Sequence, residues 1–104
     1  MKHIVILAAG LLASGVTGAV NAQDAAKLAA DKACLACHAI DKKVVGPAFK
    51  DVAAKYKGNA KAEAILVQKV LKGGVGAWGQ IPMPANASLK EDEAKLLVKW
   101  VLGQ

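Results

Sequence analysis

The chain has 104 residues, enough for one small domain, and 14 basic residues against 8 acidic ones give a formal charge of +6. All of the basic residues are lysines scattered among alanines, a pattern that argues against nucleic acid as the partner. Only 4% of the residues are aromatic, so a domain of this size needs something other than side chains to fill its interior.

Residues 1–22 are predicted to be a secretory signal peptide. A positively charged N-terminus precedes the apolar run Ile4 to Leu12, and Val20-Asn21-Ala22 resembles a cleavage site. The alternative is an uncleaved membrane anchor, because the uncharged stretch is near the length of a bilayer-spanning helix, but glycines and hydroxylated residues interrupt it. Cleavage would leave residues 23–104 as a single domain in the periplasm, without stable membrane insertion.

The first predicted helix covers residues 24–36, because Asp24 can cap it and the following run is rich in Ala, Leu and Lys. It leads into the C-x-x-C-H signature of c-type haem attachment, which comprises Cys34-Leu35-Ala36-Cys37-His38. Two thiols three positions apart on a helix share one face and could bond to the vinyl groups of one porphyrin. His38 would then be the proximal ligand of the iron.

Other interpretations of the two cysteines are a thiol–disulfide pair or a metal site. A redox C-x-x-C pair would use Cys34 and Cys37 with His38 merely adjacent. A zinc site needs four ligands, and two cysteines and two histidines are too few once His3 is removed with the signal peptide. Blue copper usually needs two histidines, so the same shortage excludes it. A haem needs only two axial ligands.

Pro47 stands at the first turn of a second predicted helix, over residues 48–57, and follows a polar loop at 39–45. Its carbonyl could also accept a hydrogen bond from the Nδ1–H of His38, which would leave Nε2 free to face iron. A third helix is predicted over residues 60–72, with Asn59 as its cap.

Residues 73–86 have no regular pattern and are predicted to form a long loop without strands. Met83 lies in this loop between two prolines and is the only methionine outside the predicted signal peptide. A core position is possible for a methionine, but the flanking prolines restrict the backbone, and iron ligation is the favoured interpretation. The run Ser88-Leu89-Lys90-Glu91 predicts a capping box that opens a final helix, which Gly103 ends.

Over residues 23–104 the chain resembles the small bacterial class I cytochromes c of the c-551/c-552 (c8) group. Four segments fall in that family's order and spacing: C-L-A-C-H-A-I-D, V-G-P-A-F-K-D-V-A-A-K-Y, W-G-Q-I-P-M-P-A-N and A-K-L-L-V-K-W-V-L. The resemblance implies an all-α fold of about four helices around one covalently bound haem. It also implies thioether links from Cys34 and Cys37, and axial ligation by His38 and Met83.

The resemblance implies four supporting residues as well. Trp78 and Lys69 fall at positions that bond haem propionates, although the second is often arginine, and lysine lacks the bidentate fork. Asn86 falls where an amide orients the methionine ligand, and Pro47 falls where a carbonyl receives the N–H of the proximal histidine.

A haem with two axial ligands has no open site for a substrate, so the expected function is one-electron transfer by a monomeric carrier, not catalysis. The alternative is a haem enzyme or gas sensor, which would need a displaceable Met83. The expected partners are redox proteins with acidic patches, such as a nitrite reductase, a terminal oxidase or a cytochrome peroxidase. The lysines that could surround the haem edge and attract them are Lys42, Lys43, Lys50, Lys55, Lys57 and Lys61.

Overall fold

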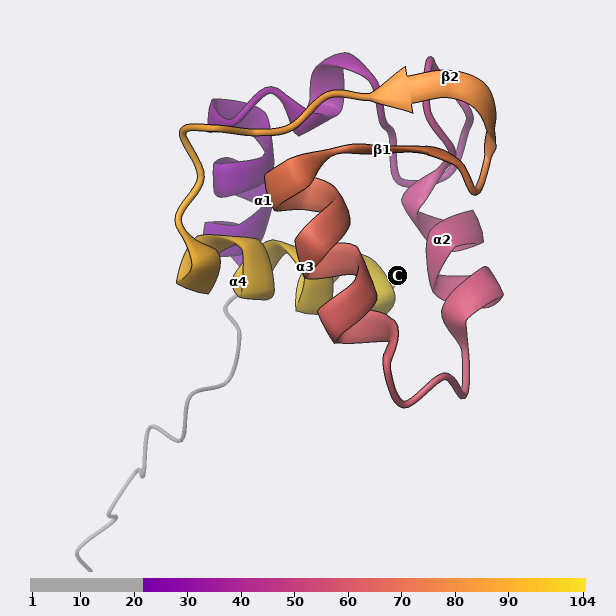
Figure 1. Cartoon of the computed structure of the whole chain (residues 1–104). Helices are drawn as coiled ribbons and strands as arrows, with labels where there is room; N and C mark the ends of the chain where they lie inside the picture. Colours follow the sequence, from indigo (N-terminus) through magenta and orange to yellow (C-terminus); the bar gives the residue numbers. More distant parts are fainter. Residues whose placement is uncertain (1–21) are drawn as a thin grey trace, which may run out of the picture.

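The computed structural model describes residues 22–104 (Figure 1). The predicted signal peptide therefore lies outside the described residues, apart from Ala22. Within residues 22–104, no helix is both long enough and apolar enough to cross a bilayer.

The described part of the chain contains four α-helices, in agreement with the predicted all-α fold. They are α1 (Ala22–Asp31), α2 (Phe49–Tyr56), α3 (Ala62–Lys72) and α4 (Glu91–Leu102). A short 3₁₀ turn, Cys34–Ala36, follows α1, and a hairpin of β1 (Gly74–Gly76) and β2 (Gly79–Met83) follows α3. The hairpin runs along one edge of the molecule, from the side of α1 toward the side of α2 (Figure 1).

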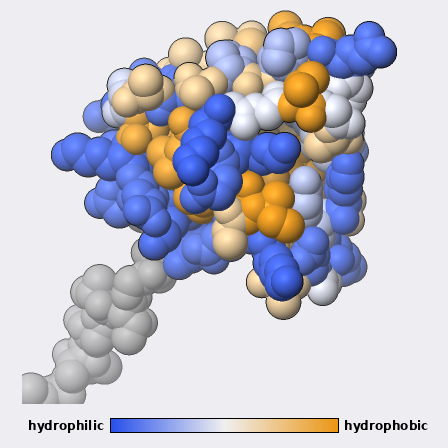
Figure 2. Space-filling model, in the orientation of Figure 1, coloured by the Kyte–Doolittle hydropathy of each residue, from blue (hydrophilic) through white to orange (hydrophobic). Residues whose placement is uncertain are grey.

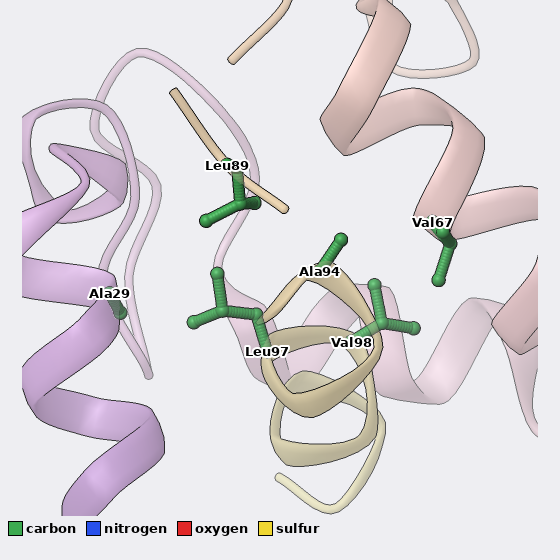
Figure 3. Close-up of a cluster of buried hydrophobic side chains, with 6 residues drawn as sticks. All are labelled: Ala29, Val67, Leu89, Ala94, Leu97 and Val98. Atoms are coloured by element: carbon green, nitrogen blue, oxygen red, sulfur yellow. The ribbon is translucent and has the colours of Figure 1, made fainter. Parts of the chain in front are cut away.

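The core is built around α4, which contacts all three of the other helices. On α4, Leu97 points toward Ala29 of α1, and Val98 points toward Val67 of α3 (Figure 3). This core is thin, because within the described residues no large side chain is completely buried. The expectation from composition, that side chains alone fill little of the interior, agrees with this arrangement.

Helix α1 ends at Asp31, so the prediction of a helix through residue 36 was wrong. Ala33 adopts the left-handed conformation with φ of 63°, which an α-helix cannot continue through. The chain then enters the 3₁₀ turn that contains the first cysteine. Asp24 lies within the first turn instead of capping it, where its negative charge interacts favourably with the helix dipole.

The predicted loop at residues 73–86 instead contains antiparallel strands, which corrects the expectation of no strand. Gly74 pairs with Met83, and Gly76 pairs with Gly79. The alternation of apolar and polar residues that usually reveals a strand is missing here, because β1 is only three residues long and contains two glycines. The hairpin nevertheless fixes the backbone position of Met83.

The capping box predicted at Ser88 is displaced by two residues. Helix α4 begins at Glu91 with Lys90 as its N-cap, and the Lys90 backbone N–H donates a hydrogen bond to Glu93 Oε1 at 3.0 Å. The Ser88 hydroxyl donates to Asn86 Oδ1 at 3.0 Å. The cap predicted at Asn59 is likewise displaced by two residues, because the N-cap of α3 is Lys61, whose backbone N–H donates a hydrogen bond to Asn59 Oδ1.

Candidate cofactor site

Cys34 and Cys37 lie at the two ends of one tight turn. The backbone N–H groups of Cys37 and His38 both donate to Cys34 O, at 3.2 and 2.9 Å. Side chains three positions apart eclipse one another in a 3₁₀ turn, so the two thiols share a face although the segment is not α-helical. Both thiols are free and half-buried, and both line the same cavity.

The His38 imidazole is fixed by a hydrogen bond and by packing. Its Nδ1 lies 2.7 Å from Pro47 O, which is the bond expected from the sequence. A carbonyl can only accept, so Nδ1 carries the proton and Nε2 keeps a free lone pair. The Phe49 ring stacks on the imidazole with a centroid distance of 5.1 Å and an interplanar angle of 24°.

Gly46 lets the chain pass close to this imidazole, a contact that no pattern in the sequence indicates. The N–H groups of Val45 and Gly46 donate to Cys37 O at 3.2 and 2.7 Å, which draws the loop against His38. A Cβ atom on Gly46 would lie 2.5 Å from His38 Cε1, a distance at which one of the two must move.

We expect Gly46→Ala to displace the imidazole and to lower the unfolding free energy by about 1–3 kcal/mol, the usual cost of overpacking. Thermal denaturation of the purified protein measures the effect. Gly103→Ala is the matched control, because its added Cβ would meet only ordinary contacts at 3.5 Å. Equal melting temperatures for the two variants would contradict the close packing of Gly46 on His38.

Met83 is placed at the same cavity by the end of β2. Gly73, with φ of 77°, permits the close approach of the two ends of the hairpin, since a Cβ there would lie 2.7 Å from Met83 O. The segment that follows is tied back by the Asn86 N–H, which donates to Val70 O at 3.0 Å. The methionine therefore projects from a backbone held on both sides.

The cavity has a volume of about 330 Å³, in the range typical of small-molecule and cofactor sites. Much of its lining is apolar and includes Phe49, Val52, Leu97 and Val98. It brings together seven of the eight residues singled out from the sequence, which are Cys34, Cys37, His38, Pro47, Lys69, Trp78 and Met83.

Asn86 is the residue that does not line this cavity. Its side-chain Nδ2 donates to Lys32 O at 3.0 Å, and its Oδ1 accepts from the Ser88 hydroxyl. These bonds tie the segment after Met83 to the end of α1. The role of Asn86 in orienting the methionine stays a prediction.

Lys69 and Trp78 reach the cavity from α3 and from the hairpin turn. Lys69 lies over Gly74, where an added Cβ would be 2.8 Å from the Lys69 Nζ. Trp78 is 44% exposed, and its indole N–H donates no hydrogen bond within the described residues. Both side chains thus bring a nitrogen donor to the cavity, and their bonding to propionates stays a prediction.

Burial raises the pKa of the Cys34 thiol, and a hydrogen bond from its own backbone offsets this only in part. A thiol–disulfide catalyst requires the opposite, because the attacking species is the thiolate and its formation is favoured by a lowered pKa. The environment of Cys34 therefore argues against a thiol–disulfide oxidoreductase.

The model of the cytochrome c family matches residues 22–104, which is the whole of the described chain. The chain belongs to the cytochrome c family. It is 55% identical to cytochrome c-551 of Pseudomonas aeruginosa over 106 aligned residues, which cover 100% of this chain and 99% of that protein. It is 47% identical to cytochrome c-552 of Nitrosomonas europaea over 90 residues, which cover 86% and 87% of the two chains.

Solved structures agree with this assignment. The crystal structure of wild-type Nitrosomonas europaea cytochrome c552 superposes with a TM-score of 0.73 and 47% identity, and covers 75% of this chain and 96% of that one. A class 1 cytochrome, MtoD from Sideroxydans lithotrophicus, superposes with a TM-score of 0.69 and 34% identity, covering 82% and 97%. The class I cytochrome c fold is therefore confirmed, and membership of the family supports a role as an electron carrier.

The residues of this cytochrome c fit the covalently bound haem that the family implies. Two free thiols share one face, and an imidazole whose Nδ1 is bonded to Pro47 O and a thioether reach the same cavity from different elements. Within residues 22–104, no three His, Cys, Asp or Glu side chains converge as a protein-ligated metal ion would require. The donor set thus suits an iron whose remaining ligands come from a porphyrin.

Proposed function

We propose that this protein is a periplasmic one-electron carrier that holds haem c through Cys34 and Cys37, with His38 and Met83 as axial ligands. The observation that carries the proposal is the 2.7 Å contact between His38 Nδ1 and Pro47 O, in a cavity that Met83 also lines. This contact leaves Nε2 as the only imidazole nitrogen able to bind a metal.

When bound, the haem supplies the iron that accepts and gives up the electron. The hydrogen bond to Pro47 O holds the His38 ring in one orientation and increases its basicity as a ligand. The soft thioether of Met83 and the apolar lining of the cavity both disfavour the additional charge of ferric iron, so they raise the reduction potential. With His38 and Met83 both bound to the iron, no coordination position would remain for a substrate.

The proposal is tested on protein exported and purified from the periplasm. After denaturation in acidified acetone, the haem should remain with the polypeptide, and the native protein should show one reversible one-electron wave in voltammetry. The ferric form should not bind cyanide on mixing. Colourless protein, extractable haem or immediate cyanide binding would each contradict the proposal, the last in favour of a haem enzyme or gas sensor.

The partner-docking face is proposed to lie at the loop that follows the haem-binding motif. Lys42 and Lys43 are exposed there beside the exposed apolar residues Val44 and Val45, and Val45 also lines the cavity. The face drawn in Figure 2 carries many hydrophilic residues, with hydrophobic residues exposed between them. An apolar contact with flanking positive charges suits brief association with an acidic redox protein.

We expect Lys42→Gln/Lys43→Gln to slow electron transfer to an acidic redox protein several-fold at low salt, because the two charges steer the encounter. Stopped-flow rates over a range of ionic strength measure the effect, and the salt dependence should become shallower. Lys27→Gln/Lys72→Gln is the control with the same change in charge at other exposed positions. Identical salt dependences for the two double variants would remove this docking face from the proposal.

A further inference from the structure

Lys55 connects α2 with the hairpin turn by two contacts of one ammonium group. Its Nζ donates a hydrogen bond to Ala77 O at 2.7 Å, and the same atom lies 4.5 Å from the centroid of the Trp78 ring. The first contact is a charge-assisted hydrogen bond and the second is a cation–π interaction. Both partners belong to the turn between β1 and β2, more than twenty positions further along the chain.

The turn offers the indole little other support. Gly76 and Gly79 flank it with φ of 100° and 111°, and a Cβ on either glycine would meet nothing within 4 Å. Trp78 is 44% exposed, and among the described residues its ring packs on no other aromatic ring. Two glycines in an open turn give the backbone considerable freedom, so the direction of the Trp78 side chain depends on a contact from outside the hairpin.

Helix α2 can provide this contact because it is firmly packed. Val52, one turn before Lys55, is buried, and Phe49 packs edge-on against Trp100 of α4 at 5.4 Å between centroids. Helix α2 also carries the ring that stacks on His38. Lys55 therefore links the cavity wall that holds the imidazole to the turn that holds the indole.

We propose that Lys55 is a positioning residue that fastens the β1–β2 turn to α2 and holds the Trp78 indole at the cavity. The inference rests on the proposed function in that the cavity is taken as the haem site. It also removes Lys55 from the lysines available for docking, because its ammonium group is already engaged within the chain. The sequence placed Lys55 among the docking lysines, and gave no indication of the contact with Trp78.

The test is hydrogen exchange, measured by NMR on the reduced, haem-loaded protein. In Lys55→Met, the backbone amides of Gly76 and Gly79, which pair across the turn, should exchange about fivefold faster or more. This factor follows from the lower ends of the energy ranges for a cation–π contact and a hydrogen bond. Lys55→Arg keeps the charge and the donor and should restore the exchange rates to within about twofold of the wild type. Lys57→Met removes the same charge from an exposed neighbour and should have no effect on the turn.

Three results would overturn the role of Lys55. They are equal exchange in Lys55→Met and Lys57→Met, failure of Lys55→Arg to restore slow exchange, and a uniform increase that includes the amides of α4. The last would indicate general destabilisation instead of a local release of the turn. Any of these in protein with attached haem contradicts only the role of Lys55, whereas protein purified without haem contradicts the proposed function.

Discussion

Replacing Met83 by alanine should lower the reduction potential of the haem-loaded protein by a few tenths of a volt, within the span of about 0.8 V that axial ligands can cover. The thioether stabilises ferrous iron, and alanine has no donor to replace it. The ferric protein should also lose its sulfur-to-iron charge-transfer band. Water or added cyanide could then bind at the vacated position, so the variant should bind cyanide on mixing where the wild type does not.

Voltammetry and visible spectra of Met83→Ala measure both effects. Ile81→Ala is the matched control, since it removes an apolar side chain from the same strand at a residue that also lines the cavity and is 67% exposed. It should keep the band and change the potential much less. Retention of the charge-transfer band in Met83→Ala would refute the assignment of Met83 as a ligand.

The parts of the site that the sequence predicted are those marked by residues close together in the chain. The spacing of Cys34 and Cys37 places two thiols on one face in either a 3₁₀ turn or an α-helix, so the prediction survived an error about the helix. The contact of His38 with Pro47 spans only nine positions and follows from the chemistry of an imidazole and a carbonyl. Helix α2 was predicted to within one residue at each end.

The parts that the sequence did not predict depend on residues far apart or on backbone conformation. The left-handed φ of Ala33 ends α1 early, although alanine strongly favours helix. The hairpin brings Met83 to Gly74 through backbone pairing. The sequence gives no sign of this pairing, because glycine and proline are rare in strands. The close approach of Gly46 to His38 and the contact of Lys55 with Trp78 exist only once the loop and the hairpin have folded onto other elements.

The double variant Cys34→Ala/Cys37→Ala should carry no covalently attached haem, and its chain should be poorly ordered. The core around α4 contains no fully buried large side chain within the described residues, and Phe49, Val52 and Leu97 of this core also line the cavity, where a porphyrin would pack against them. A porphyrin that buries several hundred Å² of apolar surface contributes on the order of 10 kcal/mol as an upper bound. This equals the whole net stability of a typical domain.

Extraction with acidified acetone and thermal denaturation followed by circular dichroism measure the two effects. Leu35→Ala is the control, because it changes an exposed residue between the two cysteines and leaves both thiols in place. It should keep its haem and unfold cooperatively near the wild-type temperature. If the haem-free double variant unfolds as cooperatively as the haem-loaded Leu35→Ala variant, the side chains around α4 suffice for the fold. The covalent cofactor would then serve electron transfer alone, and the thin core would have to gain its stability from the packing of the helices.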